Sequence, residues 1–257
     1  MFSIRLTTPL ALLSALAACT PDGGPPAATS PTPAAPNASA VQQAARDYRV
    51  HYNTPVDLDS TDYYYQPVSV LSQDGSSPSR TYDSGSSYGS SSEGRSGIEG
   101  TCYNVLFLRK SGPAEQRLLL PHGRFVLTSI DDERQPDSRW PYLFYTVVKA
   151  DTNADQEQDE EDATTLFASD RSGQHLRQLT PDGTQLQSRH YLPPTSLLLV
   201  EVRPDTNHDQ EFTAADAPYW LRYDLRNLSA PPTRTPTPAL GGQLHRQMLQ
   251  RQTSPAH

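Results

Sequence analysis

Short apolar runs separated by polar turns dominate the chain between residues 60 and 228. The runs are four to nine residues long, rich in β-branched, aromatic and leucine residues, and bounded by Gly, Pro, Asp and Ser. Examples are YNVLFLRK, RFVLTSI, YLFYTVVKA, TTLFAS, SLLLVEV and YWLRYDL. Runs of this length and composition are typical of β-strands. No stretch in this region keeps a period of 3.6 residues with helix caps. The sequence therefore predicts an all-β domain of antiparallel strands over residues 61–228.

The pattern repeats along the chain. Residues 106–123 (LFLRKSGPAEQRLLLPHG) align with residues 166–183 (LFASDRSGQHLRQLTPDG), through a shared LF, Ser-Gly and R-x-L-x-P-x-G skeleton. Residues 143–157 align in the same way with residues 197–211. Self-similarity at such spacing indicates a structural repeat, here with a unit of about 55–60 residues and four strands.

The repeat divides the predicted domain into units. We expect four-stranded units at residues 124–179 and 186–228, and a partial unit before them in which residues 65–71 and 103–110 form a hairpin. The segment RQLTPDG, followed by two strands and a hairpin, resembles the TolB-type β-propeller repeat, whose blades are four-stranded antiparallel meanders. Closed propellers usually have about four to eight blades, and two to three are present here. The resemblance therefore implies an open or sandwich-like β domain, or a ring that closes with a second copy.

The N-terminus is predicted to be an export signal over residues 1–18. Arg5 precedes an apolar segment, PLALLSALAA, that is too short to span a bilayer. The segment runs into LAAC, which resembles the lipobox of bacterial lipoproteins and implies a diacylglyceryl group on Cys19 that holds the protein at a membrane. Thr20 stands where an Asp would imply inner-membrane retention, so the resemblance favours the outer membrane. The alternative is an ordinary signal peptide with a chance cysteine.

The segments on either side of the domain are poor in large apolar residues. Residues 19–60 are predicted to be a disordered tether, and residues 229–257 a Pro/Thr/Gln-rich tail with a weak helix signal over 242–252. Residues 72–101 form a Ser/Gly-rich loop inside the domain. This loop contains GSSYG, a formal match to G-x-S-x-G, but low-complexity sequence supplies no strand-to-helix elbow around the serine.

Negative charge is concentrated in two short stretches. Residues 151–162 hold seven of the 29 acids and residues 205–216 hold four, with no Lys or Arg in either. Removing these 11 acids would change the net charge from −8 to +3. Because the acidity is local, it favours a bound cation. The chain has no Lys/Arg-rich run of the kind that tracks phosphates, so a nucleic-acid partner is not expected.

Both stretches follow the frame D-x-N-x-D-x-x-x-x-x-x-D. Acceptors at positions 1, 3, 5 and 12, with a backbone carbonyl at position 7, are the arrangement with which loops surround Ca²⁺. The stretches resemble the calcium loops of EF-hands and, more closely, of dockerins. The candidate ligands of two structural calcium sites are Asp151, Asn153, Asp155, Glu157 and Asp162 in the first, and Asp205, Asn207, Asp209, Glu211 and Asp216 in the second.

Three features depart from the calcium-loop pattern. Position 6, which prefers Gly, is Gln156 or Gln210, and position 8, usually apolar, is Gln158 in the first stretch but Phe212 in the second. The flanking runs are predicted strands and not helices. We therefore expect calcium-type loops that close β-hairpins. Solvated acidic turns are the alternative, because Asp and Asn favour turns.

No catalytic motif is present. The seven His residues are scattered, and Cys102 would be the only thiol left in the mature chain, so a Zn²⁺ or Cu²⁺ site is not expected. We expect a non-enzymatic, calcium-binding envelope lipoprotein whose domain serves interaction or scaffolding, with a protein or envelope polymer as partner. Two alternatives stay open: an envelope hydrolase with convergent catalytic side chains, and a carbohydrate-binding module with exposed aromatic residues.

Overall fold

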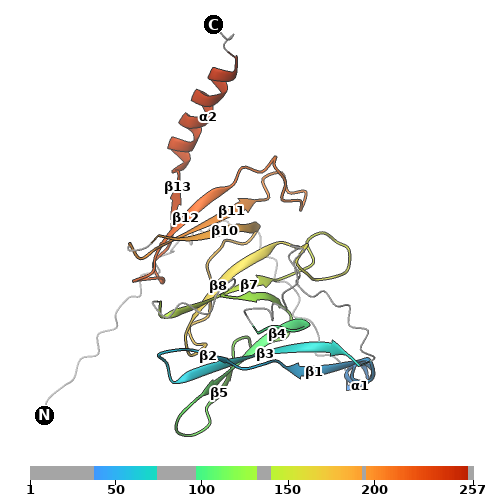
Figure 1. The fold of residues 1–257 in the computed structure, drawn as a ribbon. Helices are drawn as coiled ribbons and strands as arrows, with labels where there is room; N and C mark the ends of the chain where they lie inside the picture. The colour runs from blue at the N-terminus through green and yellow to red at the C-terminus, as the bar shows by residue number, and fades with distance from the viewer. Residues whose placement is uncertain (1–37, 74–96, 132–139, 193–194, 254–257) are drawn as a thin grey trace, which may run out of the picture.

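The computed structural model describes residues 38–73, 97–131, 140–192 and 195–253, and it consists mostly of antiparallel β-sheet (Figure 1). The elements are α1 (Ala38–Asp47), β1 (Tyr48–Tyr52), β2 (Val56–Asp57), β3 (Tyr63–Ser72), β4 (Thr101–Arg109), β5 (Gln116–Leu118), β6 (Val126–Ile130), β7 (Tyr142–Val148), β8 (Thr164–Asp170), β9 (Arg177–Gln178), β10 (Thr184–Leu192), β11 (Leu197–Pro204), β12 (Tyr219–Asp224), β13 (Thr233–Thr235) and α2 (Pro238–Thr253). The predicted all-β class is confirmed at this level.

The larger sheet folds over on itself. Its strand order is β1-β3-β4-β6-β7-β8-β9, with β2 paired to β3 and β5 paired to β4. The first half (β1–β5) meets the second half (β6–β9) through the single residue pair of Cys102 in β4 with Leu127 in β6. Side chains from both halves share one core, which includes Tyr65 and Phe107 from the first half and Tyr145 from the second. The two halves therefore pack face to face.

The smaller sheet, of order β10-β11-β12-β13, covers the other face of the second half. Along β7, Leu143 and Tyr145 point into the first core, whereas Phe144 between them points into a second core with Leu198 and Val200 of β11. Successive side chains of a strand point to opposite faces, so β7 is buried on both. This explains its continuous apolar sequence, and the result is a stack of three layers (Figure 1).

The predicted strand units agree with this topology. The hairpin predicted from residues 65–71 and 103–110 is confirmed by the pairing of β3 with β4. Consecutive antiparallel strands β6–β9 occupy the predicted first unit. The predicted second unit holds β10–β12, and the fourth strand of that sheet, β13, lies beyond its predicted end at residue 228. Among the described residues neither sheet closes into a barrel.

The β domain is longer than the sequence predicts. β1 and β2 lie within the predicted tether of residues 19–60, yet both pair with β3. β13, in the predicted tail, pairs with β12 and completes the smaller sheet. Short strands of this kind are held by pairing with longer strands and not by their own apolar content, so composition does not reveal them. The domain accordingly runs from Tyr48 to Thr235.

The two helices lie outside the sheets. α1 precedes β1 and buries none of its residues. α2 begins after Thr237, whose carbonyl accepts a hydrogen bond from Gly241 N–H at 2.8 Å, and Pro238 occupies the first turn, where its missing N–H costs nothing. Neither helix of the described chain is long and apolar enough to span a bilayer. The predicted signal peptide and Cys19 lie outside the described residues.

Candidate calcium-binding loops

The two acidic stretches occupy equivalent connections of successive layers. The first acidic loop (residues 151–162) joins β7 to β8, and the second acidic loop (residues 205–216) joins β11 to β12. Both lie at the same end of the stack (Figure 1). Antiparallel pairing of β7 with β8 and of β11 with β12 shows that strands flank both loops, as predicted. The predicted Ser/Gly-rich loop of residues 72–101 falls mostly on residues 74–96, which lie outside the described residues.

The first half of the first acidic loop is held by its own side chains. The Asp151 carboxylate accepts a hydrogen bond from Gln156 N–H at 2.9 Å. The side-chain oxygen of Asn153 accepts one from Asp155 N–H at 3.1 Å, and the Asp155 carboxylate accepts one from Glu157 N–H at 2.8 Å. The side chains at positions 1, 3 and 5 therefore bind the backbone at positions 6, 5 and 7, which fixes a tight turn.

The second acidic loop repeats this network. Asp205 accepts a hydrogen bond from Gln210 N–H at 3.1 Å, Asn207 accepts one from Asp209 N–H at 3.2 Å, and Asp209 accepts one from Glu211 N–H at 2.9 Å. In each loop the amide nitrogen at position 3 also donates to the carboxylate at position 5. The two sequences differ at five of twelve positions. The common residues at positions 1, 3, 5, 6 and 7 are thus sufficient to build one conformation.

Position 6 adopts the backbone conformation for which calcium loops use Gly. Gln156 has φ of 73° and Gln210 has φ of 69°, both in the left-handed region. A non-Gly residue there costs on the order of 1 kcal/mol or more. The absence of Gly noted in the sequence has therefore not prevented the sharp turn. The hydrogen bond from each Gln N–H to the Asp at position 1 offsets part of that cost.

The carboxylates at position 12 close the loops from inside. Asp162 and Asp216 are fully buried, unlike the exposed acids at positions 5 and 7. Asp162 accepts hydrogen bonds from the N–H of Thr152 and, at 3.1 Å, from its hydroxyl, and Asp216 makes the same two bonds with Thr206. The other carboxylate oxygen accepts the N–H of position 9 in both loops, at 2.9 and 3.2 Å. The frame read from the sequence gives no role to Thr at position 2, although the presence of Thr152 and Thr206 in both loops is a signal for one.

Hydrogen bonding also perturbs the ionisation of Asp216. The Thr206 hydroxyl, the largest influence, and the Thr206 N–H lower the pKa of Asp216 because both donate to the charged carboxylate. The buried group therefore stays ionised despite its burial. A negatively charged carboxylate that accepts three hydrogen bonds therefore holds the loop near the end of β11.

Different interactions at position 8 tie the two loops to the preceding strands. Gln158 donates from its side-chain amide to the carbonyl of Val148, the last residue of β7, at 2.9 Å. Phe212 is half-buried, and its carbonyl accepts a hydrogen bond from Arg203 of β11 at 3.1 Å. Position 8 of the first acidic loop thus contacts the preceding strand through the side-chain hydrogen bond of Gln158, where the second acidic loop has the apolar side chain of Phe212.

The acidic loops contain the types of side chain that bind Ca²⁺. The present arrangement of these side chains suits the cation less well. Carboxylate, amide and carbonyl oxygens are the ligands that Ca²⁺ prefers. Among the described residues, however, no three His, Cys, Asp or Glu side chains converge as a metal site. In the first acidic loop the amide nitrogen of Asn153 faces the Asp155 carboxylate at 3.1 Å. Coordination would require this amide to turn its oxygen toward the cation.

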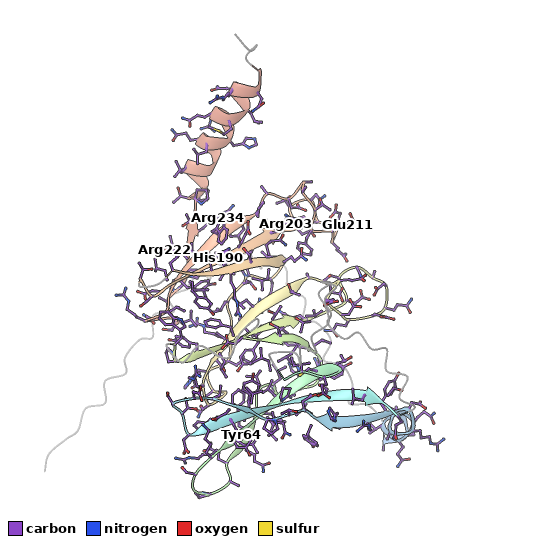
Figure 2. All side chains as sticks on the ribbon, viewed as in Figure 1. Tyr64, His190, Arg203, Glu211, Arg222 and Arg234 are labelled. Atoms are coloured by element: carbon purple, nitrogen blue, oxygen red, sulfur yellow. The ribbon has the colours of Figure 1, made fainter. Side chains whose placement is uncertain are left out.

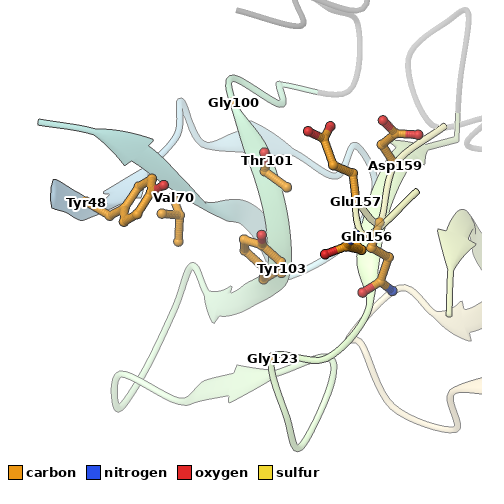
Figure 3. A pocket seen from close by; sticks show the side chains of 10 residues that line it. Tyr48, Val70, Gly100, Thr101, Tyr103, Gly123, Gln156, Glu157 and Asp159 are labelled. Carbon is orange, nitrogen blue, oxygen red and sulfur yellow. The ribbon is translucent and has the colours of Figure 1, made fainter. Parts of the chain in front are cut away.

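Two grooves flank the first acidic loop. On one side Asn153 and Glu161 face Asp209 and Phe212 of the second acidic loop across a groove. On the other side a groove runs between the loop and the first half of the larger sheet (Figure 3). The wall formed by the sheet includes Tyr48, Tyr103 and Thr101, and the wall formed by the loop consists of residues 156–159. The acidic loops therefore form a continuous rim next to an aromatic surface.

One cluster of Ser, Asp and His has a structural explanation. Asp170, at the end of β8, accepts hydrogen bonds from the Ser172 hydroxyl at 2.7 Å and from the N–H of Gln174 at 2.9 Å. Its other oxygen lies 2.8 Å from His175 Nδ1. The serine is bonded to the carboxylate and not to the histidine, so the His cannot act as its general base. The cluster stabilises the turn before β9.

No family model, curated protein or solved structure matches this chain.

Proposed function

We propose that this protein is a non-enzymatic, lipid-anchored scaffold or interaction protein of the bacterial cell envelope, with a β domain stabilised by calcium at both acidic loops. The observation that carries the calcium proposal is the common hydrogen-bond network of two loops that differ at five of their twelve positions. The same loop conformation and the same oxygen-bearing side chains occur twice, between β7 and β8 and between β11 and β12.

Charge gives a reason for a cation at the first acidic loop. Its seven acids include only one buried side chain, Asp162, and the loop contains no Lys or Arg. Two unit charges about 6 Å apart in water repel by roughly 0.7 kcal/mol, and the loop contains many such pairs. A divalent cation would remove part of this repulsion. Asp151, Asn153 and Asp155 would hold it with their side chains, Glu157 with its carbonyl, and Asp162 with oxygen lone pairs that its protein donors leave free.

The fold proposal is that the two sets of four consecutive strands are blade-like repeats of an incomplete propeller. The matching strand order of β6–β9 and β10–β13 supports this, as does the equivalent placement of the acidic loops. The pattern of LAAC after an apolar segment supports lipid attachment at Cys19. The domain would then act close to a membrane.

A second candidate function, carbohydrate binding, is favoured by the groove beside the first acidic loop (Figure 3). Tyr48 is 52% exposed and shares this groove with Tyr103, Gln156 and Gln158. Aromatic faces next to amide groups are suited to sugar rings and their hydroxyls. Titration of soluble envelope glycans, monitored by tyrosine fluorescence, would test this candidate. A Tyr48→Ala variant that bound equally well would contradict it.

Calorimetric titration of the full chain with calcium tests the main proposal. We expect two sites with dissociation constants on the order of 10⁻⁵–10⁻³ M, the range of extracellular calcium modules. At a calcium concentration 100 times the dissociation constant, one site would add about 2.7 kcal/mol to the free energy of unfolding. Magnesium at the same concentration serves as the control. No heat of binding, and a thermal midpoint unchanged by calcium and by chelator, would leave the loops as acidic turns.

A further inference from the structure

The first half of the larger sheet has one face that nothing covers in the described structure. In β3 the side chains of Tyr65 and Ser69 are fully buried in the direction of the second half, and the residues that alternate with them, such as Tyr64 and Val68, point the other way. Figure 2 shows Tyr64 on the side of β3 turned away from β7. We call this outer surface of β1, β3, β4 and β5 the open face.

The open face is apolar and exposed. Val50 pairs with Val70, and Tyr52 pairs with Val68, so that these side chains lie on the same side of the sheet. Val50 is 59% exposed, Tyr52 is 60% exposed and Leu118 in β5 is 55% exposed. The contiguous arrangement distinguishes this surface from the single exposed apolar residues that are normal on proteins.

Charge is absent from the outward positions of these four strands. Their outward residues are Tyr, Val, Leu, Gln, Ser, Thr and Asn. A charge occurs at the edge, where Asp57 of β2 pairs with Lys110. The outer face of the smaller sheet is different, because Arg203 and Arg222 point outward there (Figure 2). Glu201, which alternates with the buried Val200 and Val202, lies on the same outer face. The face at one end of the stack thus suits water, and the open face at the other end does not.

The area of the open face is sufficient for a modest interface. β1, β3, β4 and β5 contain 5, 10, 9 and 3 residues. At about 3.3 Å per residue and 4.8 Å between strands, they form a flat area of roughly 430 Å². A patch of this size equals the largest apolar patch of a typical monomer, which is often functional, and two such faces would bury the small total area that is found in weak complexes.

We propose that the open face binds the open face of a second copy of this chain, in a two-fold symmetric dimer. An uncharged face can meet its own copy without like-charge repulsion, as an interface that uses the same patch on both subunits requires. The fold itself provides a precedent. The second half of the same sheet is covered by another sheet, with Phe144 and Leu166 packed against Val200 and its neighbours. The open face is the uncovered counterpart of that surface.

We expect the dimer to form with and without calcium. Val70, at one end of the open face, lines the groove beside residues 156–159, but Tyr64 and Val68, further along β3, do not. The test is sedimentation velocity of the full chain between about 1 and 100 µM, the range in which an interface of this size associates. Every variant carries Cys19→Ser, so that no acyl chain contributes. We expect a concentration-dependent dimer that is the same in calcium and in chelator.

Two variants place a charge on the open face. Val50→Lys and Leu118→Lys should each weaken dimerisation at least ten-fold, because each would bury a charged lysine in an apolar interface. Leu192→Lys is the matched control, since Leu192 is 41% exposed on β10 and far along the chain from the open face. All three substituted positions are exposed, and an unchanged thermal midpoint would show that each variant folds.

Three results would overturn the proposal: a monomer at 100 µM, a dimer that survives both open-face substitutions, or a dimer that Leu192→Lys disrupts as strongly. A dimer that forms in calcium and disappears in chelator would place the interface on the acidic loops and would also contradict it. A dimer, together with a thermal midpoint unchanged by calcium and by chelator, would instead support this proposal while it contradicted the calcium sites. An experiment can therefore contradict the dimer proposal or the calcium proposal without contradicting the other.

Discussion

Asp216 holds the beginning of the second acidic loop through Thr206, ten residues earlier in the chain. Its buried carboxylate accepts the Thr206 N–H at 2.9 Å and also the Thr206 hydroxyl. Asp162 and Thr152 have the same relationship in the first acidic loop. The acid at the end of each frame thus has a structural role that does not depend on a metal.

This relationship predicts a loss of stability without calcium. Asp216→Ala should lower the free energy of unfolding by about 1–3 kcal/mol, because the Thr206 N–H and hydroxyl lose a charged acceptor. Asp209→Ala is the control, since Asp209 is exposed and its removal should cost little in chelator. Urea unfolding of both variants in chelator measures the difference. Equal stabilities of the two variants would show that the buried carboxylate is dispensable.

The same carboxylate should make the protein sensitive to acid. The pKa of Asp216 is lowered in the folded state, mainly by the Thr206 hydroxyl, whereas an unfolded Asp has a pKa of about 3.9. The unfolded state therefore binds the proton first, so this contribution to stability is present above pH about 4 and is lost as pH falls through the folded pKa. Unfolding free energies between pH 6 and pH 2.5 should decline below pH about 4, and less steeply in Asp216→Asn. A parallel decline in the variant would assign acid sensitivity to other groups.

Much of the fold was predictable because strand patterns and the repeat gave the same answer. The apolar runs located β3, β4, β7, β8, β11 and β12, and the repeat predicted their hairpin order. What the pattern could not give is the way the layers pack. Phe144 and Tyr145 are neighbours in sequence but belong to different cores, and only the positions of the surrounding sheets determine which face each one meets.

The acidic loops show a similar limit. Spacing alone predicted that Asp151, Asn153 and Asp155 belong to one turn, because Asp and Asn side chains bind nearby backbone groups. It did not predict that Asp162 is buried while Asp155 is exposed. Burial depends on how the loop returns to β8, which is a property of the hairpin and not of the frame.

The thiol of Cys102 should be unreactive in the folded protein. Cys102 is fully buried in the core between the two halves of the larger sheet, and burial raises its pKa to about 11. At pH 8 almost all of it is therefore protonated, and the thiolate is the reactive form. In a Cys19→Ser chain, a maleimide should label Cys102 only when denaturant unfolds the domain. Rapid labelling under native conditions would show that the two halves open readily.

Membrane attachment should depend on Cys19. If this residue carries the acyl chains, Cys19→Ser should abolish incorporation of labelled palmitate in the native cells. It should also move the protein from the high-salt-washed membrane fraction toward the soluble fraction, since acyl burial supplies about 0.8 kcal/mol per CH₂. Cys102→Ser is the matched control and should stay lipidated. Palmitate incorporation by the Cys19→Ser variant would exclude this cysteine as the attachment site.

The two acidic loops should respond unequally to calcium. The first contains seven acids and is tied to β7 through the Gln158 amide, whereas the second contains four acids and has Phe212 half-buried at the same position. Repulsion in the absence of a cation is therefore greater in the first acidic loop, and a bound cation relieves more of it. Asp155→Ala should reduce the calcium-induced rise in the thermal midpoint more than Asp209→Ala does. Differential scanning calorimetry in chelator and in about 1 mM calcium, roughly the concentration at which extracellular calcium modules are occupied, measures both rises. Equal reductions would show that the excess charge of the first acidic loop does not control its affinity, and an unchanged rise in both variants would place calcium elsewhere on the protein.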